Sequence, residues 1–186
     1  MDRSQKKARL ERRELVFVDE SGFYLLPGCV RTYAPSACTP ILKFPYTRDH
    51  LSAMSGITIT GHLFSLVRTE ALTGQESVLF LRHLLRHIGR RLLVIWDGSP
   101  IHRSYHVKDF LANGGTKQVH LERLPSYAPD LNPDECTWQH LKHVELRNFC
   151  CLNLGHLHQE LSFAIQRLRR RPSLIQSFFA AAGLVI

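Results

Sequence analysis

Three acidic residues stand at positions from which their carboxylates can converge on one point. Asp19 and Asp97 each follow a short apolar run, and Glu135 opens an amphipathic stretch. Carboxylates at the ends of adjacent buried strands and on a nearby helix can bind divalent cations, because hard cations such as magnesium prefer oxygen ligands. Such ions suit the cleavage and joining of phosphodiester bonds. The three residues are therefore predicted to form a metal-binding catalytic site.

Five segments predict strands, and their arrangement indicates an α/β domain with a mixed central sheet flanked by helices. Gly61 divides two β-rich runs as in a hairpin, so an antiparallel meander is expected to open the domain. The apolar run Leu92–Trp96 is typical of a central strand covered on both faces. Residues 26–51, rich in proline and glycine, predict turns with an edge strand. The predicted strands span residues 15–24, 55–60, 62–67, 92–96 and 119–124.

Capping residues and apolar periodicity predict the helices. Thr73 and Glu76 form a capping box at the start of one helix, and Gly89 ends it. Pro133, directly after Asn132, is a typical first helical residue for the segment that carries Glu135. The remaining predicted helices span residues 102–112, 157–168 and 173–182.

The choice of carboxylate is open at two points. Helical periodicity places Asp134 nearer than Glu135 to the apolar stripe that includes Trp138, so periodicity does not select Glu135. Glu135 is also the third residue of its helix, where a glutamate can simply bond back to the capping residue. In the first strand, alternation is expected to point Asp19 and Glu20 to opposite faces of the sheet.

Composition limits the class of protein. The chain has 186 residues, 44% of them hydrophobic, which is enough for one domain with a full core. It has no apolar run long enough to cross a bilayer, and its first 14 residues are too highly charged for a signal peptide. The cysteines are odd in number and lack Cys-x-x-Cys spacing, which favours a reduced intracellular protein. They are Cys29, Cys38, Cys136, Cys150 and Cys151.

The chain is basic, with 24 Lys and Arg against 16 Asp and Glu and a formal net charge of +8. An excess of cations predicts a polyanionic partner, because each cation near a phosphate releases a condensed counterion. The charges concentrate in residues 3–13, 82–91 and 167–171. Solubility and a favourable helix dipole are the alternative explanations for these segments.

Two pairs of histidines have the i, i+4 spacing of zinc ligands. They are His83 with His87 and His102 with His106. Neither pair belongs to a His-Glu-x-x-His pattern, and the sequence offers no evident third ligand. The spacing alone therefore does not favour zinc.

Three blocks around the acidic residues resemble the catalytic blocks of the DDE transposases of the mariner superfamily, specifically the bacterial insertion-sequence branch (a DDE superfamily endonuclease catalytic domain). The third block is the most specific, because it combines Pro-x-Leu-Asn-Pro-x-Glu with a following tryptophan and Leu-Lys. The blocks are VFVDESGF at residues 16–23, LLVIWDGSPIHRS at 92–104 and LPSYAPDLNPDECTWQHLK at 124–142. Their order and spacing extend the resemblance over almost the whole chain.

This resemblance implies an RNase H-like fold and a metal-dependent enzyme for DNA strand cleavage and strand transfer during transposition. Asp19, Asp97 and Glu135 would bind two magnesium ions, for which manganese could substitute. The family offset thus selects Glu135 over its neighbour. It also marks His102 and Asn132 as possible accessory residues.

The resemblance further implies double-stranded DNA, both transposon ends and target, as the partner of a dimer in the active complex. The predicted organisation is a basic arm or linker at residues 1–14 and the catalytic domain at residues 15–186. Since the chain starts almost at the first catalytic strand, we expect a separate helix-turn-helix polypeptide to read the DNA ends. The expected location is the bacterial cytoplasm, in association with the nucleoid. The predicted DNA-binding residues are Arg103, Lys142, Arg167, Arg169, Arg170 and Arg171.

Two other functions fit parts of the same sequence. A non-catalytic transposase remnant could bind DNA or a partner transposase through the basic segments. An RNase H-type nuclease for RNA in hybrids would use the same metal chemistry, but it does not account for the block at residues 124–142.

Overall fold

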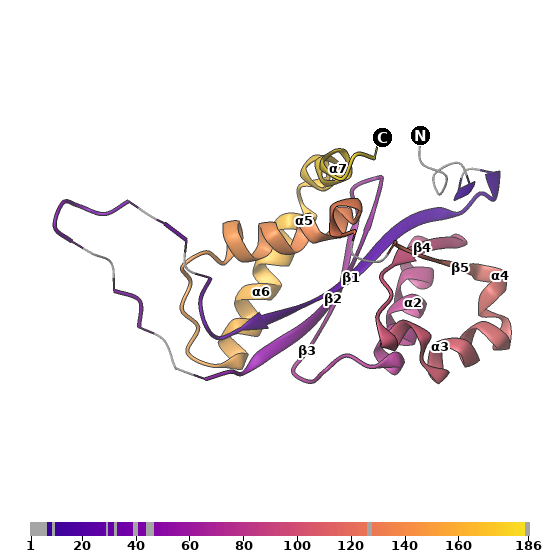
Figure 1. The fold of residues 1–186 in the computed structure, drawn as a ribbon, viewed down its shortest axis with the longest axis horizontal. Coiled ribbons are helices and arrows are strands. Elements are labelled where there is room, and N and C mark those ends of the chain that lie inside the picture. Colours follow the sequence, from indigo (N-terminus) through magenta and orange to yellow (C-terminus); the bar gives the residue numbers. More distant parts are fainter. Residues whose placement is uncertain are drawn as a thin grey trace.

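The computed structural model describes residues 7–8, 10–28, 30–31, 33–38, 41–43, 47–125 and 128–184. Within them, five strands form one sheet in the order β3-β2-β1-β4-β5 (Figure 1). The strands are β1 (Glu14–Tyr24), β2 (His50–Thr58), β3 (Leu63–Arg68), β4 (Leu92–Trp96) and β5 (Val119–Arg123). The prediction of a mixed sheet flanked by helices is confirmed.

Strand pairing explains how residues from distant parts of the sequence meet. β1 pairs antiparallel with β2 and parallel with β4, so it lies at the centre of the sheet. β2 pairs antiparallel with β3, which confirms the predicted meander, and Gly61 takes the positive φ of 86° that the tight connection needs. Phe17 is in register with Ile95. Asp19 follows Phe17 by two residues within β1, and Asp97 follows Ile95 by two residues, just past the end of β4. The two aspartates therefore lie at the same level of the sheet.

Helices cover both faces of this sheet. The longer helices are α2 (Gly74–Ile88), α5 (Pro133–His140), α6 (Leu154–Arg169) and α7 (Pro172–Ala181). The short ones are α3 (Tyr105–Phe110) and α4 (Thr116–Gln118), and single turns occupy residues 100–103, 111–115, 129–131 and 141–145. The helix predicted from Thr73, Glu76 and Gly89 is confirmed as α2, with its capping box and left-handed C-cap.

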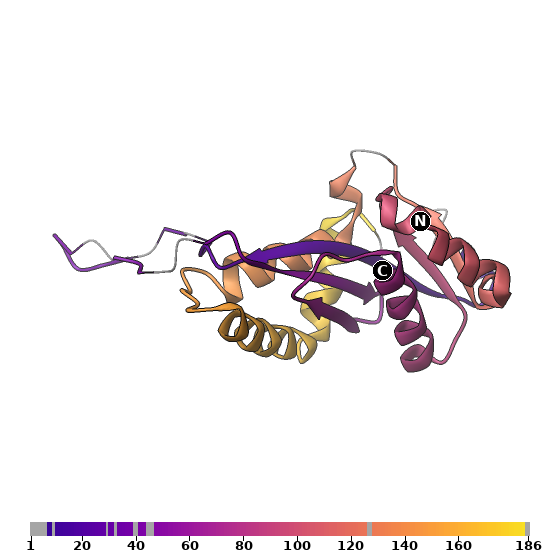
Figure 2. The ribbon, with the colours of Figure 1, turned by 90° about the horizontal axis from the view of Figure 1, so that it is seen from below.

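The side chains of β1 alternate between two cores. Leu15 and Phe17 belong to the core under α5, α6 and α7, whereas Val16 and Val18 belong to the core under α2 and α3. Figures 1 and 2 show where these two groups of helices lie relative to the sheet. This alternation extends to the next two residues. Asp19 is thereby directed toward α5, and Glu20 toward the side of α2 and α3.

Two predicted elements differ from the structure. The helix expected over residues 102–112 is divided, because the Ser104 side chain accepts a hydrogen bond from the backbone N–H of Val107 and so starts α3 anew. His102 therefore lies in the turn Pro100–Arg103 that precedes α3. Between residues 26 and 49 no strand is present among the described residues, in keeping with prolines that cannot donate to a ladder.

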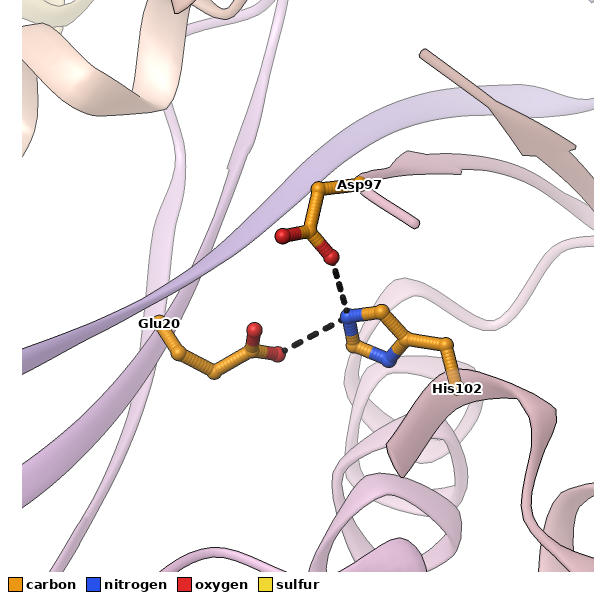
Figure 3. A group of neighbouring side chains, drawn as sticks. All are labelled: Glu20, Asp97 and His102. Carbon is orange, nitrogen blue, oxygen red and sulfur yellow. Dashed lines mark ion pairs between the residues drawn. The ribbon is translucent and has the colours of Figure 1, made fainter. Parts of the chain in front are cut away.

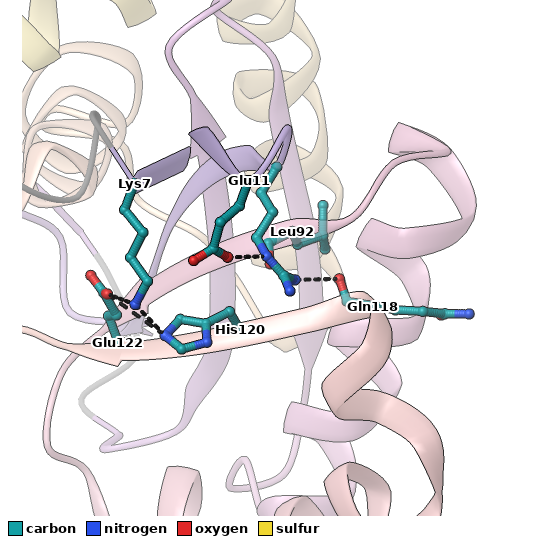
Figure 4. Close-up of polar contacts among 7 residues, drawn as sticks. Lys7, Glu11, Leu92, Gln118, His120 and Glu122 are labelled. Carbon is teal, nitrogen blue, oxygen red and sulfur yellow. Dashed lines mark hydrogen bonds and ion pairs between the residues drawn. The ribbon is translucent and has the colours of Figure 1, made fainter. Parts of the chain in front are cut away.

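The described residues of the N-terminal segment dock beside β4 and β5 (Figure 4). Ala8 is buried, and Lys7 forms an ion pair with Glu122 of β5. The guanidinium of Arg13 donates to the carbonyl oxygens of Leu92 and Gln118, at 3.3 and 3.4 Å. Within the described part of the chain, no helix has both the length and the apolar character needed to cross a membrane.

Candidate active site

Asp19 is a buried carboxylate at the centre of the sheet. Its Oδ2 atom accepts a hydrogen bond of 3.0 Å from the indole Nε1–H of Trp138 on α5. Burial, followed by the negative charges of Asp134, Glu135 and Glu20, raises the pKa of Asp19 to about 8 against the opposing effect of the indole. Asp19 therefore lies within a group of carboxylates that repel one another.

The start of α5 separates the two neighbouring acidic residues. Asp134 is fully buried and accepts a hydrogen bond of 2.7 Å from the Ser55 hydroxyl of β2. Burial raises its pKa to about 7. Glu135 is only partly buried, and it lines an open pocket with Asn132 and Gln139. The periodicity argument thus identified the buried member of the pair correctly, and Glu135 is the member that a solute can reach.

Asn132 has a clear structural role at this point. It is 5% exposed, and its side-chain oxygen accepts a hydrogen bond of 3.2 Å from the backbone N–H of Asp134. It is therefore the N-cap of α5. Asn132 fixes the direction in which the helix leaves the loop, and with it the position of Glu135.

Asp97 lies just beyond the end of β4 with half of its side chain exposed. Its Oδ1 atom accepts a hydrogen bond of 2.8 Å from the backbone N–H of Ser99. The same oxygen lies 3.2 Å from Nε2 of His102. The structure therefore links Asp19 to Glu135 through their charges and links Asp97 directly to His102.

His102 joins this site from the side of α2 and α3 (Figure 3). Its ring is 5% exposed and stacks on Trp96, with ring centroids 4.0 Å apart. Its Nε2 atom lies 3.2 Å from Oε1 of Glu20 and 3.2 Å from Oδ1 of Asp97. Glu20 thus enters the site from the opposite face to Asp19, as strand alternation predicted.

Three features of the site were not predicted from the sequence. Trp138 was interpreted only as a core residue, yet it donates to Asp19. Ser55 holds the buried carboxylate of α5 from a strand 79 residues away, which no local pattern could indicate. The guanidinium of Arg123 packs against Gly98, where an added Cβ atom would lie 2.1 Å from it. A larger residue directly after Asp97 would require the Arg123 side chain to move.

The predicted DNA-binding residues fall into two groups. Lys142 lies beside the site, since its Nζ atom donates to the Ser21 hydroxyl at 2.7 Å and burial lowers its pKa. Arg103 is exposed beside His102. At the end of α6, Arg167 pairs with Glu145, and Arg169 donates to the Leu63 carbonyl and the Ser65 hydroxyl. Arg170 and Arg171 are exposed.

The donor set fits magnesium or manganese. Three negative neighbours raise the pKa of the buried Asp19, so a cation placed among them would offset a repulsion that the fold itself creates. Carboxylate oxygens are the ligands that both ions prefer. Asp19, Asp97 and Glu135 stay the predicted ligands, although the structure couples only Asp19 and Glu135 to each other and places Asp97 with Glu20 and His102. The indole of Trp138 and the N–H of Ser99 orient the two aspartates.

Known proteins share both sequence and fold with this chain. A family model described as DDE superfamily endonuclease matches residues 14–151, a range that contains Asp19, Asp97 and Glu135. The chain is 38% identical over 58 residues to the Tc1 transposase of Caenorhabditis elegans and to the Tcb2 transposase of Caenorhabditis briggsae. These matches cover 31% of this chain and 20% of each relative, so the aligned segment spans about a fifth of these curated relatives.

Solved structures give the same result at the level of the fold. The catalytic domain of Mos1 mariner transposase matches 98% of this chain and 91% of its own, with a TM-score of 0.53 and 16% identity. The Mos1 strand transfer complex matches 98% of this chain and 60% of its own, with a TM-score of 0.57 and 17% identity. The HTLV-2 integrase catalytic core domain matches 86% of this chain and 84% of its own, with a TM-score of 0.51 and 12% identity. These similarities establish an RNase H-like core of the transposase and integrase type.

Proposed function

The chain belongs to the DDE superfamily endonuclease family, and from that premise we propose that it cleaves DNA strands and transfers them during transposition, with Asp19, Asp97 and Glu135 as its metal-binding catalytic residues. The observation that carries the proposal is the group of carboxylates around Asp19, in the middle of β1. Asp19 on β1 and Asp97 just after β4 lie at the same level of two adjacent parallel strands, and the charge of Glu135 acts on Asp19 from α5. Magnesium is the proposed cofactor, with manganese as a substitute.

Each residue has a defined part in the proposed chemistry. Bound divalent ions would stabilise the attacking and leaving oxygens of an in-line displacement at phosphorus. The indole of Trp138 holds one oxygen of Asp19 and leaves the other available, and the Ser99 N–H does the same for Asp97. Lys142 brings positive charge to this carboxylate-rich site and suits a phosphate of the DNA backbone.

DNA is the proposed partner. Support comes from the net charge of +8, from the exposed Arg170 and Arg171, and from solved Mos1 complexes described as a strand transfer complex and as paired-end complexes with a transposon end. We propose that two copies act together on two DNA ends. The block at residues 124–142 supports the further proposal that the chain comes from the bacterial insertion-sequence branch of the family.

A cleavage assay tests the proposal. The purified chain is incubated with supercoiled plasmid and with short duplex DNA in magnesium, beside the variant Asp97→Asn, which keeps the side-chain shape but removes the anionic ligand. We expect nicked and joined products from the original chain and none from the variant. Full activity in Asp97→Asn would contradict the assigned site. Preference for an RNA–DNA hybrid over duplex DNA would instead identify an RNase H-type nuclease.

A further inference from the structure

We propose that Glu20, Asp97 and His102 form a second cation site, which takes a first-row transition metal such as zinc. The three residues come from β1, from the end of β4 and from the turn Pro100–Arg103. One ligand atom from each lies within 4.8 Å of the other two. Figure 3 shows the two carboxylates pointing at the same ring nitrogen. The inference concerns cation binding and does not depend on the proposed DNA cleavage.

The distances fit donors that share one cation. Nε2 of His102 lies 3.2 Å from an oxygen of Glu20 and 3.2 Å from an oxygen of Asp97. Donor atoms bound to one ion at about 2.1 Å are separated by about 3.0 to 3.4 Å in octahedral and tetrahedral geometry. The two distances from Nε2 therefore correspond to neighbouring corners of a coordination polyhedron.

In the part of the chain that the structure describes, the buried polar atoms of the cluster have ion-pair contacts but no well-directed hydrogen bonds. Neither ring nitrogen of His102, nor Oε1 of Glu20, has a properly directed hydrogen bond among the described residues. Native proteins rarely leave buried polar atoms in this condition without a water, an ion or a functional reason. A cation between the imidazole and the two carboxylates would satisfy Nε2 and Oε1 together.

The cluster is also rigid enough to be a site. The His102 ring is stacked on Trp96 at an interplanar angle of 15°, and the N–H of Ser99 holds the Asp97 oxygen that faces it. Little side-chain freedom is then lost when a cation binds, which favours affinity.

The donor types select the kind of ion. Imidazole suits zinc and its neighbours, whereas magnesium requires an environment of oxygen atoms. A mixed set of one imidazole and two carboxylates therefore favours zinc over magnesium, and the reverse holds at the site of Asp19, Asp97 and Glu135. Since Asp97 belongs to both sets, zinc in the mixed site draws on a ligand that magnesium also needs.

The histidine spacing in the sequence did not indicate the partners of His102, which are the carboxylates of Glu20 and Asp97. The i, i+4 spacing paired His102 with His106, but the His106 side chain is exposed on α3. Glu20 instead lies 82 positions before His102 in the chain, and Asp97 lies five positions before it. The fold brings them together because β1 and β4 are adjacent.

Isothermal titration of the metal-free protein with zinc tests the site. His102→Phe keeps an aromatic ring against Trp96 but removes both nitrogens, and Glu20→Gln removes one anionic ligand. We expect each change to weaken zinc binding by at least about tenfold. The matched control His106→Phe removes the other histidine of the pair, and Asp19→Asn alters only the carboxylate site, so both should bind zinc as the original chain does.

Fluorescence gives a second reading, because the two tryptophans report different sites. Trp96 stacks on His102, whereas Trp138 contacts Asp19. In a Trp138→Phe background, paramagnetic cobalt is expected to quench Trp96, and His102→Phe should remove the quenching. Unchanged zinc affinity in both His102→Phe and Glu20→Gln would overturn the inference. So would loss of zinc binding in Asp19→Asn alone, which would assign the ion to the carboxylate site. If His102→Phe does not fold, Glu20→Gln decides the outcome.

Discussion

Replacing Asp19 by asparagine is expected to stabilise the metal-free protein at alkaline pH while abolishing the proposed DNA cleavage. The fold raises the pKa of this carboxyl group from 3.8 to about 8, chiefly through burial and then through the charges of Asp134, Glu135 and Glu20. The folded state therefore holds a proton that the unfolded chain releases. An amide has no such proton to lose, and its oxygen can still accept the hydrogen bond from Trp138.

The sign and size of the effect follow from proton linkage. Between pH 3.8 and about 8 the folded state binds more protons than the unfolded state, so this group contributes less stability as the pH rises through that window. Each tenfold change in the acid dissociation constant corresponds to about 1.4 kcal/mol. At pH 8 the Asp19 carboxyl group therefore lowers the free energy of unfolding by on the order of 5 kcal/mol. An asparagine that still buries a polar amide should recover about half of it, roughly 2 to 3 kcal/mol.

Urea unfolding followed by circular dichroism measures the change. Both proteins are unfolded in the presence of a chelator, at mildly acidic and at alkaline pH. The free energy of unfolding of Asp19→Asn should exceed that of the original chain by more at the higher pH. The control Asp49→Asn makes the same chemical change at an exposed aspartate and should shift neither value by more than about 0.5 kcal/mol.

Two results would refute this reasoning. A variant less stable than the original chain at alkaline pH would mean that the Asp19 carboxylate is stabilised, not strained, by its surroundings. A gain of the same size at both pH values would mean that the charge is not its source. Magnesium should restore stability at alkaline pH to the original chain and have little effect on Asp19→Asn, since a bound cation offsets the same repulsion.

Three further changes test other parts of the site. Glu135→Gln should lower DNA cleavage by more than about a hundredfold and Asp134→Asn by far less, because only Glu135 is accessible to a cation; the reverse ranking in the plasmid assay would show that the family offset is misleading here. Trp138→Phe removes the hydrogen bond to Asp19 and should weaken magnesium binding by about tenfold in a calorimetric titration; an unchanged affinity would mean that the indole does not orient the carboxylate. The double change Arg170→Gln with Arg171→Gln should reduce the slope of log affinity for duplex DNA against log salt concentration by about 2; an unchanged slope would place both arginines away from the DNA.

Most strands and helices were predictable because their signals are local. The capping box at Thr73 and the glycine at 89 delimit α2, and five consecutive apolar residues delimit β4. The prediction of one helix over residues 102–112 placed its start wrongly. Ser104 caps α3 and begins a new helix there, and apolar periodicity alone does not detect such a cap. The general architecture could thus be inferred before any coordinates were known.

The site was predictable only in part, because many of its contacts join residues far apart in the sequence. Asp19, Asp97 and Glu135 stand out through their positions after apolar runs and at a helix start. The hydrogen bond from Ser55 to Asp134 and the approach of Glu20 to His102 depend on strand pairing and register. No spacing within the chain encodes them, so they become visible only once the sheet is assembled.

The central place of β1 also determines when the protein becomes competent during its own synthesis. The hairpins of β1, β2 and β3 join neighbouring segments, but the hydrogen bond between Asp19 and Trp138 closes a loop of 119 residues. Contacts of such long range form late, because the entropy of loop closure must be overcome before they contribute. A ribosome that has released residues 1–123 has therefore delivered every strand of the sheet but no complete catalytic site. Only chains that extend through α5 acquire one, so products terminated before this helix lack the carboxylate of Glu135 and, by the same reasoning, cannot carry out the proposed DNA cleavage.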